Sequence, residues 1–181
     1  MKKIYILLAD GFEEVEALTP ADVLNRAGFD VRLVSASSEL LVTGAHRIAV
    51  KCDLFIEHLV SDDAILLILP GGMPGTLNLM ASENVKRCIL DFHSMGKWIA
   101  AICAAPMILG EMNLLKGKTA TCYPGYEKHL IGANIVELPA VTDGKFITGR
   151  GIGTAMAFSL EIVKNLIDQK TADELALKMV V

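Results

Sequence analysis

The sequence predicts an α/β fold in which a mostly parallel β-sheet carries helices on both faces. Short apolar runs alternate along the chain with longer segments that repeat apolar residues at helical spacing, and this alternation is typical of parallel sheets. Hydrophobic residues make up 52% of the chain, as expected of strands that are buried on both faces. The 181 residues suit one domain, and no linker, repeat or low-complexity segment interrupts them.

Six apolar runs are expected to form the strands of this sheet. In chain order they cover residues 3–9, 30–36, 64–70, 97–103, 119–123 and 145–150. Each is at most seven residues long, a length that favours a strand over a helix. The segment 40–52, "LLVTGAHRIAVKC", is expected to form a hairpin or a side sheet.

Longer segments between these runs are expected to be helical. They cover residues 13–27, 82–95, 104–115, 125–131 and 154–168, followed by a short tail helix from Thr171. Thr19 before Pro20 is typical of an N-cap and a first helical residue, and Gly28 stands where a helix-ending glycine belongs. In the second helix, Ser82 is the expected N-cap and Gly96 the expected terminator.

Charge and cysteine content disfavour several classes of protein. The formal net charge is −4 and the basic residues are scattered, so no basic stripe predicts a nucleic-acid partner. No apolar run reaches the roughly 18 residues of a membrane span, and the N-terminal run enters an acidic loop, which predicts a first strand and not a signal peptide. The four cysteines form no C-x-x-C pair. We therefore expect reduced thiols in the cytoplasm, without a disulfide framework or a bound metal.

Cys103 stands where the apolar run "KWIAAI" meets the helical run "AAPMILGEMNLL". A nucleophile on a sharp strand-to-helix turn, a nucleophile elbow, needs small neighbours because the turn brings them close to adjacent strands. Ala101 and Ala105 meet this need, and Pro106 suits a first helical turn. A helix N-terminus favours a thiolate, so the position is expected to lower the pKa of the thiol. The alternative interpretation is a buried small hydrophobe, as most cysteines are.

Two further loops follow expected strands and should meet Cys103 at the edge of the sheet where ligands bind in such folds. The loop "ADGFEEVEA" carries three glutamates. Of these, Glu16 is the best candidate to turn inward, where burial would raise its pKa and allow proton transfer. In "GGMPG", the N–H groups of Gly71 and Gly72 could hold an oxyanion. Simpler interpretations are compensation of a helix dipole by the glutamates and an ordinary glycine turn.

Other motifs in the sequence indicate neither a nucleotide site nor a histidine base. The turn "GRGIGT" lacks the third glycine of a dinucleotide-binding fingerprint, so no nucleotide cofactor is expected. The four histidines fall on expected surface elements. None of them is therefore an evident catalytic base for the cysteine.

Five segments of the chain resemble a known family in their order and spacing. They are "DGFEEVEALTPADVLNRAG", "LPGGMPG", "AAICAAPMIL", "TCYPGYEKHL" and "GRGIGTAMAFSLEIV". The chain resembles the ThiJ/PfpI family, and within it the branch of the parkinsonism-associated protein deglycase and its bacterial relatives, over residues 3–179. The resemblance implies one ThiJ/PfpI domain over residues 1–181, folded as a flavodoxin-like three-layer sandwich of the class I glutamine amidotransferase-like type. It also implies a homodimer.

The resemblance further implies which residues form the site. Cys103 would be the reactive cysteine and Glu16 its carboxyl partner, with the backbone amides of Gly71 and Gly72 near the sulfur. The amide of Ala104 would complete this group of donors. Protease-like members of the family carry a histidine directly after the cysteine, where this chain has Ala104. A Cys-His-Glu peptidase or an amidotransferase is therefore disfavoured.

The same resemblance implies how the pocket around the cysteine is lined. Arg47 aligns with an arginine that comes close to the site in relatives, often from the dimer mate, and Gly149 and Arg150 would lie at the rear. Tyr123 stands where the parkinsonism-associated branch carries a histidine, and its hydroxyl is a candidate proton donor. Cys122 is a candidate second thiol, although a strand residue at this position is expected to point into the core.

The function that the resemblance suggests is glyoxalase or deglycase chemistry on small reactive carbonyls or glycated substrates. The Cys103 thiolate would add to an aldehyde to give a hemithioacetal, and Glu16 would move the proton. The alternative is a redox sensor or oxidative-stress chaperone in which Cys103 is oxidised to a sulfinate. Both functions use the same residues, so the sequence leaves both open, and neither requires a cofactor.

Overall fold

The central feature of the computed structural model, which describes residues 2–181, is a seven-stranded sheet with the order β10-β11-β7-β6-β1-β2-β5. Neighbouring strands pair in parallel, except for the antiparallel pair of β10 and β11. The predicted mostly parallel sheet is therefore confirmed. The strands are β1 (Lys3–Leu8), β2 (Asp30–Ser35), β5 (Leu54–Phe55), β6 (Ala64–Leu69), β7 (Trp98–Ile102), β10 (Ala140–Asp143) and β11 (Phe146–Gly149).

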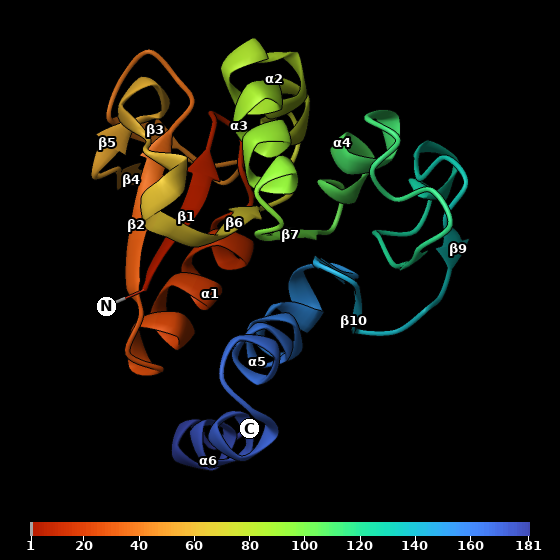
Figure 1. Ribbon diagram of the computed structural model, residues 1–181. Coiled ribbons are helices and arrows are strands. Elements are labelled where there is room, and N and C mark those ends of the chain that lie inside the picture. Colours follow the sequence, from red (N-terminus) through yellow and green to blue (C-terminus); the bar gives the residue numbers. More distant parts are fainter. Residues whose placement is uncertain (1) are drawn as a thin grey trace.

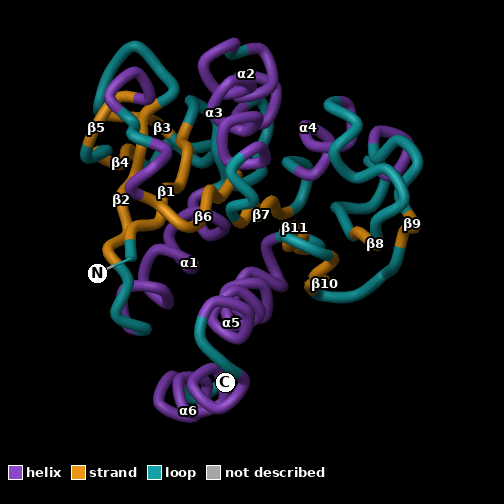
Figure 2. The backbone as a smooth tube through the Cα atoms, viewed as in Figure 1, coloured by secondary structure: helices purple, strands orange, loops and turns teal. Residues whose placement is uncertain are grey.

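Helices cover the sheet on both faces, as Figure 1 shows. One face carries α2 (Gly75–Ala81), α3 (Glu83–Ser94) and α4 (Pro106–Glu111). The opposite face carries α1 (Glu14–Arg26) and α5 (Ala155–Leu166), and α6 (Gln169–Met179) packs against α5. In Figure 2 the two groups of helices, in purple, lie on either side of the orange strands. No helix within residues 2–181 combines the length and the apolar composition that a membrane crossing requires.

The strands feed two separate hydrophobic cores because successive side chains of a strand point to opposite faces of a sheet. In β1, Tyr5 and Leu7 join the core beneath α3 and α4, whereas Ile4, Ile6 and Leu8 join the core beneath α1 and α5. Each fully buried side chain of this size stabilises the fold by roughly 1.5–3 kcal/mol relative to an exposed one. Burial on both faces thus explains the high apolar content of the chain.

Several predicted helix ends are confirmed. The Ser82 hydroxyl accepts a hydrogen bond of 3.3 Å from the N–H of Val85, as an N-cap does. Gly28, with φ of 86°, and Gly96, with φ of 64°, adopt the left-handed conformation that follows a helix.

The helix predicted over 13–27 is confirmed, but the N-cap predicted at Thr19 is wrong. The helix α1 begins at Glu14, preceded by Glu13 in an extended conformation, and Pro20 lies inside it. A proline in a helix removes one backbone hydrogen bond, but carboxylates in the first turn favour the helix terminus. The helix therefore starts six residues before the proline and continues through it.

The chain between residues 104 and 139 departs most from expectation. The predicted helix 104–115 ends at Glu111, and Asn113 beyond it has φ of 58°. The predicted helix 125–131 is wrong, because this segment forms only a 3-10 turn, Glu127–His129, after a glycine with φ of 97°. The predicted strand 119–123 shortens to β8 (Thr119–Ala120), which pairs with β9 (Asn134–Ile135) in a small separate sheet.

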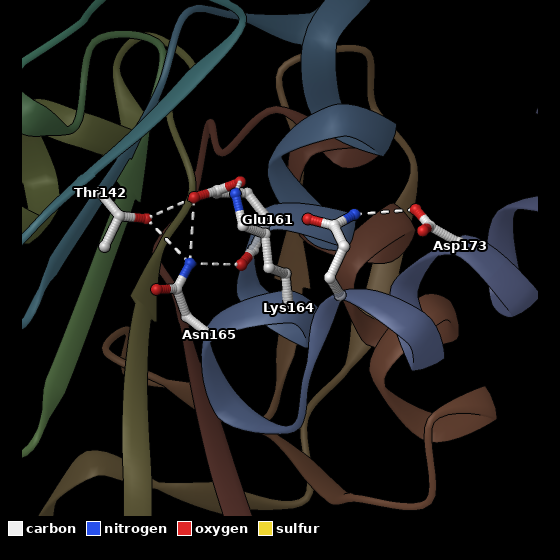
Figure 3. A network of polar contacts seen from close by, with 6 residues as sticks. Thr142, Glu161, Lys164, Asn165 and Asp173 are labelled. Atoms are coloured by element: carbon white, nitrogen blue, oxygen red, sulfur yellow. Dashed lines mark hydrogen bonds and ion pairs between the residues drawn. The ribbon is translucent and has the colours of Figure 1, made fainter.

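A polar network fixes the antiparallel edge strand β10 to α5 (Figure 3). The Thr142 hydroxyl donates to Oε1 of Glu161 at 2.8 Å, and Nδ2 of Asn165 donates to the same oxygen at 3.0 Å. Lys164 adds an ion pair of 3.3 Å to the other carboxylate oxygen. This side-chain anchoring accounts for an edge strand that no apolar run in the sequence predicted.

The expected hairpin is also confirmed. Strands β3 (Leu41–Thr43) and β4 (Ala49–Lys51) pair antiparallel in a small sheet of their own. The turn between them packs on the loop that leads into α1, where the N–H of Ala45 donates to the carbonyl of Phe12 at 2.8 Å. The hairpin therefore lies beside the loop that carries the acidic residues of α1.

Candidate active site

Cys103 occupies a strained turn between β7 and α4. Its φ of 65° lies in the left-handed region, which a residue other than glycine rarely adopts. The turn is fixed by a hydrogen bond of 2.9 Å from the N–H of Cys103 to the carbonyl of Gly149. Ala104 and Ala105 are buried and Pro106 is the first residue of α4. The structure thus places Cys103 on the strand-to-helix turn that the sequence predicts, and backbone strain of this kind, on the order of 1–3 kcal/mol, concentrates at functional sites.

Glu16 turns inward from the first turn of α1, as predicted, and its side chain is fully buried. The N–H of Gly71 donates to Oε2 at 3.0 Å. Oε1 has no hydrogen-bond partner of normal geometry within residues 2–181, although the Cys103 thiol interacts with the carboxyl. Burial raises the pKa of Glu16 to about 7, against the opposing effects of Cys103 and the Gly71 N–H. The carboxyl can therefore gain or lose a proton near neutral pH.

The pKa of the Cys103 thiol is raised, so the expectation of an acidic thiol is wrong. Burial is the main cause, and the charge of the Glu16 carboxylate and its hydrogen bond with the thiol add to it. The N–H groups of Ala104 and Gly72 lower the pKa but do not outweigh these effects. The start of α4 cannot compensate because a carboxylate beside the sulfur opposes a second negative charge.

Acidity does not distinguish Cys103 from the other three thiols, because the pKa values of all four are raised. Burial raises the pKa of Cys122 to about 11 and those of Cys52 and Cys88 to about 12. These three side chains are buried, whereas Cys103 is partly exposed. What distinguishes Cys103 is its access to solvent, its strained turn and a carboxyl group that can take its proton.

Gly71 lies between the carboxyl group of Glu16 and the side chain of Cys103. A Cβ atom at this position would lie 2.6 Å from Oε2 of Glu16 and 2.7 Å from Cβ of Cys103. Any other residue would therefore push the two side chains apart. Because its N–H is already bound to Glu16, Gly71 cannot serve as an oxyanion donor at the same time, which corrects the sequence prediction. The amides of Gly72 and Ala104 remain as the donors that face the sulfur.

The rim of the site is formed in part by Tyr123. Its N–H donates to the carbonyl of Cys103 at 2.8 Å, and its side chain is 46% exposed. Gly151 leaves room for the ring, because a Cβ atom there would lie 3.1 Å from it. Cys122, the neighbouring residue, is buried in the core beneath α3 and α4, whereas Cys103 packs against the opposite core. The structure thus places Cys122 in the core, and the two thiols pack with different hydrophobic clusters.

The predicted pocket residues differ in their relation to Cys103. Gly149 lies at the site, because its carbonyl receives the Cys103 N–H. The Arg150 guanidinium instead forms an ion pair of 3.5 Å with Glu137. Arg47 is exposed in the turn between β3 and β4, with φ of 68°, and forms no ion pair within residues 2–181. Its approach to the site of a partner subunit stays a prediction.

Sequence reasoning missed the contact between Glu14 and His46. Glu14 is buried although charged, and its Oε2 lies 2.8 Å from Nδ1 of His46. The two residues are 32 positions apart, so only the packing of the hairpin on α1 brings them together. The alternation of apolar and polar residues in the hairpin gave no sign of this contact.

Comparison with known proteins assigns the chain to a family. Residues 2–165 match the DJ-1/PfpI family. DJ-1 homolog B of Arabidopsis thaliana is 37% identical over 177 residues, which are 97% of this chain but 40% of that protein. A deglycase of Pyrococcus abyssi is 36% identical over 169 residues, 91% of this chain and 99% of that protein. The chain thus spans less than half of the Arabidopsis protein but nearly all of the archaeal one.

Solved structures show the same fold. The crystal structure of DJ-1beta from Drosophila melanogaster superposes with a TM-score of 0.94 at 34% identity, covering 99% of this chain and 98% of that chain. A mostly parallel sheet between two layers of helices is the flavodoxin-like architecture of the class I glutamine amidotransferase-like type. The chain belongs to the DJ-1/PfpI family, so both the resemblance and the predicted fold are confirmed.

Proposed function

We propose that this protein is a cysteine-dependent enzyme that acts on small reactive carbonyls or their adducts, with glyoxalase or deglycase chemistry. The observation that carries the proposal is the pairing of a buried Glu16 carboxyl, held by Gly71, with the thiol of Cys103 on its strained turn. Relatives of similar length from Pyrococcus that are named deglycases support it.

In the proposed reaction, Glu16 acts first as a base. The Cys103 sulfur attacks the carbonyl carbon while its proton passes to the Glu16 carboxylate, and the electron pair of the C=O double bond moves to the oxygen. The amides of Gly72 and Ala104 stabilise the resulting oxyanion. Glu16 then returns the proton to that oxygen, which gives a neutral hemithioacetal and restores the carboxylate. A thiol with a raised pKa suits this order, because its proton leaves only as the new bond forms.

The test is turnover of methylglyoxal by the wild-type protein and by Cys103→Ser and Glu16→Gln. We expect both variants to lose activity by at least roughly 100-fold, the range of a lost general base or nucleophile. Cys122→Ala is the matched control, because it removes a thiol that lies in the core, and its activity should remain. Wild-type protein without turnover, or Cys103→Ser with unchanged turnover, would remove the proposal.

The second candidate function is a redox sensor or oxidative-stress chaperone. It is favoured by the partial exposure of Cys103 and by the raised pKa of Glu16, which leaves a protonated carboxyl able to donate a hydrogen bond to an oxidised sulfur. Oxidation of the thiol to a sulfinic acid consumes two molecules of peroxide and releases two of water. A protein that accumulates sulfinate but does not consume methylglyoxal would support this function over the first.

We further propose a single domain that forms a homodimer, in a compartment that keeps thiols reduced, such as the cytoplasm. Val15, Leu18 and Ile48 are exposed by 38–55% and line one groove of about 410 Å³ with Met156. This apolar surface adjoins the hairpin that carries Arg47, so a second copy seated on it would bury apolar area. Sedimentation at micromolar concentration distinguishes a dimer from a monomer. A monomer would contradict the proposal.

A further inference from the structure

The β3–β4 hairpin is fastened to the first turn of α1 by one buried carboxylate. Oε1 of Glu14 accepts the N–H of His46 at 2.8 Å and that of Ile48 at 3.5 Å. Its Oε2 faces Nδ1 of His46 at 2.8 Å. The hairpin backbone comes so close that a Cβ atom on Gly44 would collide with this carboxylate. His46 itself remains exposed, so its imidazole can exchange protons freely.

The first turn of α1 is connected in turn to the Cys103–Glu16 pair. The N–H of Glu13 donates to the carbonyl of Gly71 at 2.9 Å. The N–H of the same Gly71 donates to Oε2 of Glu16 at 3.0 Å. A contiguous path of short contacts therefore runs from His46, through the start of α1 and Gly71, to the carboxyl beside the thiol.

Charge follows the same path. Nδ1 of His46 lies 3.7 Å from Oε1 of Glu13, and the charge of Glu13 contributes to raising the pKa of Glu16. The hydrogen bond with Glu14 and the charges of Glu13 and Glu14 raise the pKa of His46 above its ordinary value. Glu13 and Glu14 are the titratable groups that face His46 from α1, and Cys103 and Glu13 are those near Glu16.

We propose that His46 is a positioning residue for the Cys103–Glu16 pair, holding the first turn of α1 through Glu14 and offsetting the charge of Glu13. The inference rests on the proposed role of Glu16 as a base. With His46 protonated, Glu13 opposes ionisation of Glu16 less strongly. Without that positive charge, Glu16 needs a higher pH to ionise and to take the thiol proton.

The test measures the rate of alkylation of Cys103 by iodoacetamide as a function of pH, with peptide mass spectrometry as the readout. Every buffer contains EDTA, so that no bound cation replaces the positive charge of His46 beside Glu13. Wild-type alkylation should rise through a pH near that at which Glu16 ionises. In His46→Gln, which keeps a hydrogen-bond donor but loses the charge, the rise should move upward by roughly half a pH unit. In His46→Lys, which keeps the charge, it should return toward the wild-type position.

His129→Gln is the matched control. Nδ1 of His129 forms an equally short contact of 2.8 Å with Glu111, but Glu111 lies in α4, on the face of the sheet opposite to α1. Its profile should equal that of the wild type. An unshifted rise in His46→Gln, or equal shifts in His46→Gln and His46→Lys, would overturn the inference. Because alkylation needs no carbonyl substrate, this outcome is independent of the methylglyoxal assay.

Discussion

The N–H of Gly71 donates a hydrogen bond of 3.0 Å to Oε2 of Glu16. This bond orients the carboxyl toward the Cys103 thiol and removes one amide from the group of oxyanion donors. It also makes the glycine an obligate part of the site, because a side chain at this position would contact both functional groups. The relation between these two residues underlies the first two predictions.

Gly71→Ala should damage both the site and the fold. The added methyl group would meet Glu16 and Cys103 at 2.6 and 2.7 Å, and overpacking of this kind costs about 1–3 kcal/mol. Urea denaturation should show this loss, and Cys103 alkylation should slow by roughly 10-fold or more because the carboxyl is displaced. Gly153→Ala is the control, since a Cβ atom there meets nothing within 4 Å. Equal behaviour of the two variants would contradict the assigned role of Gly71.

Glu16 should make the stability of the protein depend on pH. Its pKa is about 7 in the folded chain against 4.5 as the ordinary value, so between these values the folded state holds a proton that the unfolded state has lost. The contribution of Glu16 to the free energy of unfolding is therefore fully present below pH 4.5 and declines as the pH rises to 7. At about 1.36 kcal/mol for each pH unit, the decline approaches roughly 3 kcal/mol.

Glu16→Gln removes this titration and keeps an acceptor for the Gly71 N–H. As the pH rises from 4.5 to 7.5, the unfolding free energy of the wild type should therefore fall relative to that of the variant. Urea denaturation at a series of pH values measures it. A constant difference across this range would show that Glu16 ionises in the folded chain as an exposed glutamate does.

Mild peroxide should convert Cys103 to a sulfinic acid without forming a disulfide to Cys122. The Cys122 side chain is buried in the core on the other face of the sheet, and a protonated Glu16 can donate a hydrogen bond to one sulfinate oxygen. Glu16→Asp withdraws the carboxyl by one methylene group and should shift the products toward sulfenate or sulfonate. Mass spectrometry of the peptide containing Cys103 counts the added oxygen atoms.

Cys122→Ala is the control for this oxidation and should give the wild-type distribution of products. A disulfide between Cys103 and Cys122 would contradict the placement of Cys122 in the core. An unchanged distribution in Glu16→Asp would exclude Glu16 from stabilising the oxidised sulfur.

Glu161 should contribute to stability through the strand that it anchors. Glu161→Ala leaves the Thr142 hydroxyl and the Asn165 amide without their shared acceptor (Figure 3). Because the Asn165 amide keeps the Glu161 carbonyl as an acceptor at 2.8 Å, the loss should be about 0.5–1.5 kcal/mol, to be measured by urea denaturation. Lys164→Ala removes only an exposed ion pair and should cost no more than about 1 kcal/mol. A larger effect in Lys164→Ala than in Glu161→Ala would reverse this assignment.

Much of the sheet and the turn at Cys103 could be predicted because they depend on short stretches of sequence. An apolar run such as that of β6 fits a strand buried on both faces, and small residues around Cys103 fit a tight turn. The helix predicted over 125–131 failed because one glycine with positive φ and the packing of this segment on α4 outweigh weak helical periodicity. The strand β10 escaped prediction because side chains of α5, far along the chain, hold it in place.

In the site, too, features set by local sequence could be predicted, whereas features set by distant contacts could not. The inward turn of Glu16 could be predicted from its place after a strand, but the sign of the pKa change of Cys103 could not. That sign depends on how close the carboxylate comes to the sulfur, which only the packed loops determine. The contact of His46 with Glu14 joins residues 32 positions apart and left no trace in local patterns.

The two edges of the sheet affect whether the protein polymerises at high concentration. The edge strands are β5, with two residues, and β10, with four. Long unpaired edges act as templates on which other chains add strands, and short edges deny them that template. The side chains that tie β10 to α5 further hold this edge in a fixed position. The sheet therefore presents little backbone for edge-to-edge polymerisation, and self-association is left to the side-chain surfaces.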